Sequence, residues 1–215
     1  MAKYNVSKSF QWAGTITEKV GKVMRMFGVS YDRLTGHRDS HRCEVEFGDG
    51  DIVFITGPSG AGKSVLLREF ERELPADERI NLSDIELSAD RTLVDCIEGD
   101  FLTAINLLST AGLNDVFCVL NQPANLSDGQ KYRYRLAMAL AAGKKYIFAD
   151  EFCTNLDSIT ACVISCNIRR YANRQGVTFI LASVRQDMLA ELCPDVIVEK
   201  RFDEQAKVTY KKMRM

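Results

Sequence analysis

One glycine-rich stretch combines residue types at a spacing that points directly to phosphate chemistry. Gly57, Gly62, Lys63 and Ser64 follow the P-loop pattern G-x-x-x-x-G-K-S, behind the apolar run "DIVFIT" and ahead of an amphipathic stretch that Pro75 ends. Backbone N–H groups in such a loop turn inward on phosphates, and the helix that follows adds its positive dipole end. The lysine reaches the β- and γ-phosphates, and the serine hydroxyl holds Mg²⁺. The stretch therefore predicts a site for ATP, or another nucleoside triphosphate, with Mg²⁺.

The predicted phosphate contacts are continuous in the sequence. The alternative, a chance glycine-rich turn before a helix, is disfavoured because strand, loop and helix occur in the order that the motif requires. These residues leave the choice between adenine and guanine open. We expect contacts to the nucleotide from the whole loop, Gly57, Pro58, Ser59, Gly60, Ala61, Gly62, Lys63, Ser64 and Val65.

Two consecutive carboxylates supply the second half of the predicted site. Asp150 and Glu151 follow the apolar run "YIFA", which is typical of a buried parallel strand. We expect Asp150 to hold Mg²⁺ directly or through a water molecule. Glu151 would face the γ-phosphate, where it can orient the attacking water or accept its proton. The pair therefore favours hydrolysis over transfer to an acceptor, although a plain exposed turn is the alternative for these two residues taken alone.

The stretch "LSDGQ", Leu126 to Gln130, resembles the signature motif of the ABC ATPases, usually written LSGGQ. Ser127 can cap the following helix while Gln130 closes a capping box. The resemblance implies that the signature of one ATPase domain completes the ATP site of its partner. Ser127, Gly129 and Gln130 are then expected to contact a nucleotide held by a second subunit. For this chain the resemblance implies a head-to-tail homodimer, or a pair with a similar protein, that sandwiches two ATP molecules.

Further stretches extend the same resemblance along the chain. "TNLD", Thr154 to Asp157, looks like the D-loop that crosses the dimer interface, so Asp157 is expected there. "VSKSF" resembles the strand that delivers an adenine-stacking aromatic, and Phe10 matches that role. The resemblance thus implies an ATPase that uses ATP and Mg²⁺, with Glu151 and Lys63 as catalytic residues and Ser64 and Asp150 as metal ligands.

Besides Asp128, which replaces a glycine of the signature, two positions depart from the pattern of the ABC ATPases. The switch histidine that contacts the γ-phosphate is absent, and the aligned position is Val184 or Arg185. Arg185 could contact the γ-phosphate as a cation, although it cannot titrate as histidine does, so slow hydrolysis is expected. The glutamine that precedes the helical insert is also missing, and its neighbourhood offers only Ser83, Asp84 and Glu86.

We expect one domain over residues 1–215 with the α/β fold of the ABC ATPases. A parallel P-loop sheet would form the core, with an antiparallel β edge and a small helical subdomain, residues 81–143, that carries the signature motif. Residues 11–44 would form an insertion before the P-loop. Within it, "TITEKVGKVMRMFGV" predicts an amphipathic helix with a Thr15–Glu18 capping box and an apolar stripe that packs on the core. Residues 30–42 would be a polar connector.

The composition and the N-terminus argue against a membrane-spanning or secreted protein. The formal net charge is −1, and no apolar run approaches the roughly 20 residues of a membrane-spanning helix. The N-terminus lacks the features of a signal peptide, so we expect a cytoplasmic protein with reduced cysteines. Of the seven cysteines, Cys162 and Cys166 stand at helical spacing, but zinc would need two further ligands, which favours ordinary buried thiols. His37 and His41 lie in a polar stretch and are expected to be solvated.

The resemblance leaves several biological roles open. The chain looks most like stand-alone ABC ATPases found with or fused to GNAT acetyltransferase-like domains. This favours an ATP-driven clamp on a GNAT-like protein, another partner or nucleic acid, in DNA maintenance, DNA modification or phage biology. The alternatives are the ATP-binding subunit of a membrane transporter, which is less favoured, and a slow-hydrolysing ATP-gated scaffold. A basic surface for nucleic acid, or else solvated helix faces, would be formed by Lys131, Arg133, Arg135, Arg169, Arg170, Arg174, Lys211, Lys212 and Arg214.

Overall fold

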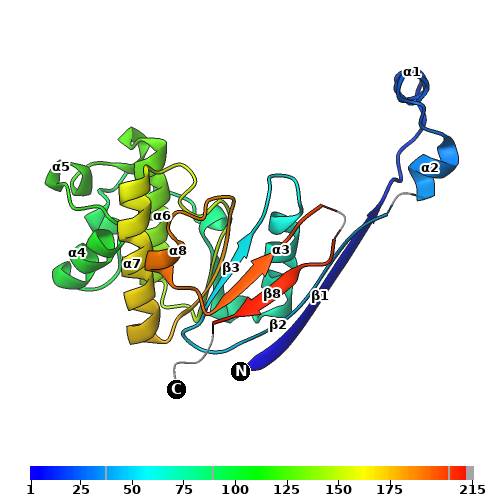
Figure 1. The fold of residues 1–215 in the computed structure, drawn as a ribbon. Coiled ribbons are helices and arrows are strands. Elements are labelled where there is room, and N and C mark those ends of the chain that lie inside the picture. Colours follow the sequence, from blue (N-terminus) through cyan, green and yellow to red (C-terminus); the bar gives the residue numbers. More distant parts are fainter. Residues whose placement is uncertain (37, 89, 203, 212–215) are drawn as a thin grey trace.

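A six-stranded sheet forms the centre of the computed structural model, which describes residues 1–36, 38–88, 90–202 and 204–211 (Figure 1). The strand order is β4-β5-β6-β3-β7-β8, and every neighbouring pair is parallel except β7 and β8. The expected α/β architecture is therefore confirmed. The strands are β3 (Ile52–Thr56), β4 (Arg79–Asn81), β5 (Tyr146–Ala149), β6 (Thr178–Ser183), β7 (Val196–Glu199) and β8 (Lys207–Tyr210).

Layers of helix and strand cover both faces of this sheet (Figure 1). On one face lies α3 (Lys63–Glu73), which a separate pair of antiparallel strands covers from outside. On the other face lie α6 (Asp128–Ala141), α7 (Ser158–Gln175) and the short α8 (Leu189–Leu192). Side chains of β3 alternate between the two cores, because successive residues of a strand point to opposite faces. This burial on both faces explains the unbroken apolar sequence of β3.

The outer strands extend beyond the body as an arm. β1 (Ala2–Gln11) and β2 (Arg38–Phe47) pair along their whole length, and Figure 1 shows two helices at the far end of the arm. These helices are α1 (Glu18–Phe27) and α2 (Tyr31–Gly36). The two helices and most of β2 lie within the expected insertion, residues 11–44, whereas β1 precedes it except for Gln11 and carries Phe10 near its outer end.

Three expectations about the arm are wrong. The cap of α1 is Thr17, whose side chain accepts a hydrogen bond from the Val20 N–H at 3.3 Å, so the Thr15–Glu18 capping box does not form. The apolar stripe of α1 does not pack on the core, since this helix holds no buried residue. The physical reason is its place at the end of a two-stranded arm, away from the sheet. The expected polar connector instead forms α2 and the start of β2.

The segment between the P-loop helix and the signature is largely helical, as expected, but it begins with a strand that sequence patterns missed. β4 is only three residues long and adds a parallel edge to the sheet. Several apolar side chains are exposed on the helices that follow or directly after them, Phe101, Leu102, Val116, Phe117 and Leu120. The remaining elements are α4 (Phe101–Thr110), α5 (Val116–Val119) and the 3-10 turns at Ala76–Glu78, Leu82–Asp84, Val94–Cys96 and Pro123–Asn125.

Candidate functional site

Sheet topology brings the predicted catalytic motifs to one edge. β6 lies between β3 and β5, and the three strands are parallel, so their carboxyl ends meet at the same edge of the sheet. The P-loop follows β3, the Asp150–Glu151 pair follows β5, and Val184 follows β6. Ligands of open parallel sheets bind at this edge. Motifs nearly a hundred residues apart in the sequence thus face one cleft.

A cavity of about 440 Å³ occupies this edge. It unites the residues expected to hold the phosphates and the metal with the expected catalytic glutamate. The apolar side chain of Val184 lines it at the position where the resemblance implies a histidine. The full lining is Ser59, Gly60, Gly62, Lys63, Ser64, Val65, Asp150, Glu151, Thr154, Ala182, Ser183 and Val184.

Lys63 is held inside the P-loop by the loop's own backbone. Its ammonium donates hydrogen bonds to the carbonyls of Gly57 (3.0 Å) and Pro58 (2.8 Å), and the side chain is buried. Burial lowers the pKa of Lys63, and the nearby carboxylates of Asp150 and Glu151 oppose this shift. The lysine therefore sits where its charge is poorly solvated, so an anionic phosphate offers it a stronger partner than carbonyl oxygens do.

The backbone around Glu151 adopts conformations that L-residues rarely take. Glu151 has φ 50° and Cys153 has φ 56°, and the Glu151 N–H donates to the Asp150 carboxylate at 3.0 Å. Such strain persists only where surrounding contacts impose it, and it is common at functional sites. The Thr154 hydroxyl, in the wall of the same cavity, is buried and has no hydrogen-bond partner among the described residues. It is a donor that a phosphate oxygen or water could satisfy.

A second cavity of about 500 Å³ adjoins the first and shares Gly60, Gly62 and Val65 with it. The two cavities therefore form one cleft around the P-loop, with the expected phosphate side in the first cavity and the expected base side in the second. Phe10, the expected base-stacking residue, lines the second cavity.

Sequence patterns missed three other residues of the base side. His41 meets Phe10 edge to face with ring centroids 5.9 Å apart, and Phe202 and Lys200 line the same cavity. His41 is thus part of the cavity wall, whereas solvation had been expected; His37 lies outside the described residues. No local motif marks these positions, because they come from β2 and from the segment between β7 and β8. Their spacing from the P-loop could not reveal them.

The signature residues form the expected cap at the start of α6. The Ser127 hydroxyl accepts from the Gln130 N–H at 3.3 Å, and the Gln130 side-chain oxygen accepts from the Ser127 N–H at 2.9 Å, so the capping box is confirmed. Gly129 packs closely on the D-loop, since a Cβ there would lie 3.2 Å from Leu156. Neither cavity of the cleft is lined by these signature residues. Their expected contact with a nucleotide therefore remains a prediction about a second subunit.

Val184 and Arg185, the two candidates for the switch position, point to different places. Val184 lines the phosphate-side cavity and is 47% exposed. The guanidinium of Arg185 instead donates to the carbonyls of Cys153 (3.1 Å) and Leu156, on either side of Thr154. In this arrangement the D-loop side and Asp187 engage the hydrogen-bond donors of Arg185, and its expected contact with the γ-phosphate stays a prediction. Asp157 ends the D-loop as the cap of α7, accepting from the Thr160 N–H at 2.9 Å, and hydrogen bonds from the side chain and backbone of Thr160 lower the pKa of Asp157.

The residues present fit Mg²⁺ together with a nucleotide better than a metal held by protein alone. Ser64 and Asp150 offer a hydroxyl and a carboxylate in the same cavity. Within the described ranges there is no group of three or more His, Cys, Asp or Glu residues that could hold a metal ion, which includes the region of Cys162 and Cys166. Mg²⁺ typically takes one or two protein ligands and fills its other positions with phosphate oxygens and water.

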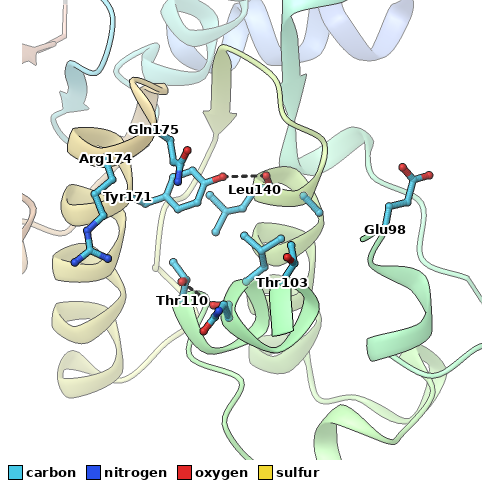
Figure 2. Close-up of a pocket in the computed structure, with 10 residues that line it drawn as sticks. Glu98, Thr103, Thr110, Leu140, Tyr171, Arg174 and Gln175 are labelled. Atoms are coloured by element: carbon cyan, nitrogen blue, oxygen red, sulfur yellow. Dashed lines mark hydrogen bonds between the residues drawn. The ribbon is translucent and has the colours of Figure 1, made fainter. Parts of the chain in front are cut away.

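A further pocket lies away from the P-loop, between α4, α6 and α7 (Figure 2). Its volume is about 520 Å³, and the Tyr171 hydroxyl donates to the Leu140 carbonyl at 3.1 Å within it. Glu98, Thr103 and Gln175 add polar groups to its wall. It contains neither the glycine loop nor the Asp150–Glu151 pair, so it is not the expected site for ATP.

Three of the basic residues expected to form a surface for nucleic acid instead donate hydrogen bonds within the protein, while Lys131 is half-buried and Lys211 is exposed. Arg133 donates to the carbonyls of Gly129 and Gly112, and Arg135 donates to that of Ile85. Arg169 binds the Asp195 carboxylate at 2.5 Å and two further backbone carbonyls. Arg170 and Arg174 are exposed, while Lys212 and Arg214 lie outside the described residues. The described arginines thus contribute mainly to internal hydrogen bonding.

Comparison with curated proteins finds ATP-binding proteins of importers. The methionine import ATP-binding protein MetN of Sodalis glossinidius (strain morsitans) is 30% identical over 185 residues, which cover 69% of this chain and 53% of that protein. The corresponding protein of Histophilus somni (strain 129Pt) is 28% identical over 214 residues, covering 84% of this chain and 61% of that protein. The chain therefore spans about half to three fifths of these relatives. No family model matches the sequence.

Comparison with solved structures confirms the expected fold. The ATP-binding cassette MJ0796, in a dimeric post-hydrolysis state bound to ADP and Pi, superimposes with a TM-score of 0.67 at 18% identity, covering 97% of both chains. A second dimeric structure of MJ0796, a bacterial ABC transporter cassette, gives a TM-score of 0.64 at 20% identity, with coverage of 82% of this chain and 93% of that one. No helix in the described ranges is long and apolar enough to cross a membrane.

Proposed function

We propose that this chain, which has the ABC ATPase fold and is similar in sequence to ATP-binding proteins of importers, binds Mg·ATP and hydrolyses it in a head-to-tail homodimer. The observation that carries the proposal is the meeting of Lys63, Ser64, Asp150 and Glu151 in one cavity at the carboxyl edge of the sheet. Fold similarity supports the sandwich arrangement, because both MJ0796 structures named above are dimeric.

Each residue of the cavity has a distinct chemical task in this proposal. The P-loop amides and the Lys63 ammonium bind the phosphates, and Ser64 with Asp150 would hold Mg²⁺. When bound, Mg²⁺ neutralises negative charge on the phosphate oxygens. Glu151 orients the attacking water and accepts its proton at the carboxylate.

Val184 explains why slow hydrolysis is expected. A valine side chain has no hydrogen-bond donor, so this position cannot stabilise charge on the transferred phosphoryl group. Removal of one such donor typically reduces kcat by about 10²–10³-fold. The Lys63 ammonium and the Thr154 hydroxyl are the groups of the same cavity that can share this task.

A dimer would bury apolar side chains near the cleft. Ile159 and Val163 on the first turns of α7 are exposed, as is Val184 beside the cavity. They stand next to the D-loop, the segment that the resemblance assigns to the dimer interface. Covering them with a second copy would remove apolar surface from water, which favours association.

The Glu151→Gln variant tests the ATPase proposal directly. The amide keeps the shape of the carboxylate but cannot accept the proton, so phosphate release should stop while ATP still closes the dimer. Light scattering with Mg·ATP should then show a stable dimer for the variant and a transient one for the wild-type chain. Gln130→Ala is the matched control, because it alters the signature at the partner-facing end and should prevent the dimer. A monomeric, inactive chain under all nucleotides would contradict the proposal.

For the partner, we propose a membrane transport component rather than nucleic acid. The relatives named above are import proteins, and the exposed apolar face of α4 and α5 offers a surface for a protein partner. The internal hydrogen bonds of Arg133, Arg135 and Arg169 remove three cations from the basic surface that nucleic acid would need. The partner proposal thus reverses the order of preference reached from the sequence, and the GNAT-associated resemblance stays a prediction.

Two measurements separate these partners. An affinity for DNA that falls steeply with salt would support nucleic acid as the partner, because phosphate contacts release counterions. We expect no DNA binding. Recovery with cell membranes should instead depend on the apolar face and fail in Phe117→Glu, whose side chain is 81% exposed in the wild type. Phe27→Glu, on the distant arm, is the matched control and should leave recovery unchanged. Equal recovery of both variants would reject docking through α4 and α5.

A further inference from the structure

Arg185 joins two loops that the catalytic cleft depends on. It follows β6 directly, and its backbone N–H donates to the Ser183 hydroxyl at 3.2 Å. Its guanidinium reaches across to the segment after β5, where it donates to the carbonyls of Cys153 and Leu156 and to the Ser158 hydroxyl at 3.0 Å. The side chain is only 18% exposed.

Asp187 fixes the orientation of this guanidinium. The Arg185 Nε donates to one carboxylate oxygen at 3.0 Å, and Nη2 donates to the other at 2.5 Å, so the pair is bidentate. These bonds from Arg185 hold the pKa of Asp187 down to about 2. A planar fork held from one side presents its remaining N–H groups in fixed directions, which a lysine could not do.

We propose that Arg185 is a positioning residue for hydrolysis: it fixes the D-loop, Thr154–Asp157, against the end of β6 and so holds the loop that carries Glu151. The inference rests on the proposed function. The carbonyls that Arg185 binds lie on both sides of Thr154, whose buried hydroxyl lines the phosphate-side cavity.

The surrounding contacts agree with a rigid connection. The Ser183 hydroxyl donates to the Phe152 carbonyl at 3.0 Å, and the Phe152 N–H donates to the Ala182 carbonyl at 2.8 Å. Glu151 and Cys153, on either side of Phe152, have positive φ. Since a strained backbone persists only when its neighbours impose it, the bonds from β6 and Arg185 help to maintain this loop, together with the bond from the Cys153 N–H to the Tyr132 hydroxyl at 3.1 Å.

The position of Arg185 also connects the two sites of a dimer. One edge of the D-loop contacts the nucleotide cavity of its own chain through Thr154, and the other edge contacts the signature helix through Leu156. A displacement of the D-loop would therefore move the signature residues that serve the second subunit. Arg185 should influence cooperativity between sites as well as the rate at one site.

The Arg185→Ala variant tests the proposal, with Arg169→Ala as the matched control. Arg169 also binds a carboxylate, that of Asp195, and backbone carbonyls, and its side chain is 13% exposed, but it lies away from the cleft. We expect Arg185→Ala to reduce kcat by about 10²-fold, the scale of a misplaced catalytic geometry, with the Kd for ATP nearly unchanged because the P-loop is intact. Arg169→Ala should lose stability without that selective loss of kcat. Guanidinium ions at millimolar concentration should restore activity to Arg185→Ala, whereas Arg185→Lys should stay slow.

Hydrogen exchange gives a readout that does not require ATPase activity. The N–H groups of Thr154 and Leu156 bind carbonyls of Glu151 and Cys153 within the loop. Their exchange should accelerate in Arg185→Ala and, to a smaller degree, in Asp187→Asn, but not in Arg169→Ala. Unchanged exchange in Arg185→Ala, or a kcat no lower than that of Arg169→Ala, would overturn the proposal. An inactive wild-type chain with accelerated exchange in the variant would instead reject the ATPase proposal and keep the positioning role.

Discussion

Gly57→Ala should damage the P-loop through backbone geometry rather than through loss of a contact. Gly57 has φ 141°, a conformation that side-chain-bearing residues rarely adopt, and a Cβ there would lie 1.9 Å from the Lys200 carbonyl oxygen. That carbonyl cannot move freely. The Lys200 N–H donates to the Thr56 carbonyl at 2.8 Å, and the buried Lys200 ammonium binds the carbonyls of Arg201 and Glu204.

The expected loss of stability follows from the strained φ of Gly57 and from the clash with the Lys200 carbonyl. The forbidden φ alone costs about 1–3 kcal/mol, and the clash with fixed backbone brings the expected total to about 3 kcal/mol or more. For a chain of this size each kcal/mol lowers Tm by about 2–4 °C, so Tm should fall by about 6–12 °C. ATP binding should also be lost, because the loop must leave its conformation to accept the methyl group.

Thermal unfolding of Gly57→Ala and Gly143→Ala tests this reasoning. Gly143 also has a positive φ, 61°, but nothing lies within 4 Å of its would-be Cβ. Its replacement should cost only about 1 kcal/mol of conformational strain, which lowers Tm by about 2–4 °C, and should leave ATP binding intact. Equal losses of Tm in the two variants, or normal ATP binding by Gly57→Ala, would refute the argument from the Lys200 carbonyl.

Two further predictions concern the thiols and the signature cap. Burial raises the pKa of Cys43 and of Cys153 to about 12 from 9.0, so both thiols should resist alkylation in the native protein while exposed Cys193 reacts. Because the neutral thiols are favoured in the folded state, stability should decline as pH rises from about 9 toward 12, and a flat stability profile in urea titrations would contradict this. Ser127→Ala removes the cap of α6 and should cost about 0.5–2 kcal/mol of stability. Light scattering should show that the same variant no longer dimerises with ATP. Retention of the dimer would contradict the expected contact between the signature and the second subunit.

Local motifs explain how much of the site could be predicted from the sequence. The P-loop and the Asp150–Glu151 pair each lie directly after an apolar strand, so their types and spacing fix both their chemistry and their edge of the sheet. The capping box of Ser127 and Gln130 is equally local. Phe202 and His41 could not be found in this way, because they reach the base side through the pairing of distant strands. β4 could not be predicted either, because a three-residue strand is too short to show a periodic pattern.

The apolar stripe of α1 shows a different limit. Apolar residues at helical spacing predict a helix correctly, but they do not say against what the helix packs. Here the helix stands at the end of the β1–β2 arm without any buried residue, so the usual inference from stripe to core fails. A search for the partner of that stripe must therefore look outside the chain's own core.

The switch position shows why a shift of one residue matters. β6 ends at Ser183, and successive residues beyond a strand can turn to opposite sides, so sequence alone could not decide whether Val184 or Arg185 faces the phosphates. With Val184 in the cavity, the position contributes shape but no charge. Because the guanidinium of Arg185 binds carbonyls of Cys153 and Leu156, this cation stabilises the backbone of the D-loop segment. The positive charge of Arg185 therefore stabilises the loop that carries the expected catalytic base, Glu151, and in this arrangement does not lie at the phosphoryl group. The hydrolysis rate should therefore respond more to the loss of loop geometry than to exchange of Val184 for isoleucine, which adds no hydrogen-bond donor and should change kcat little.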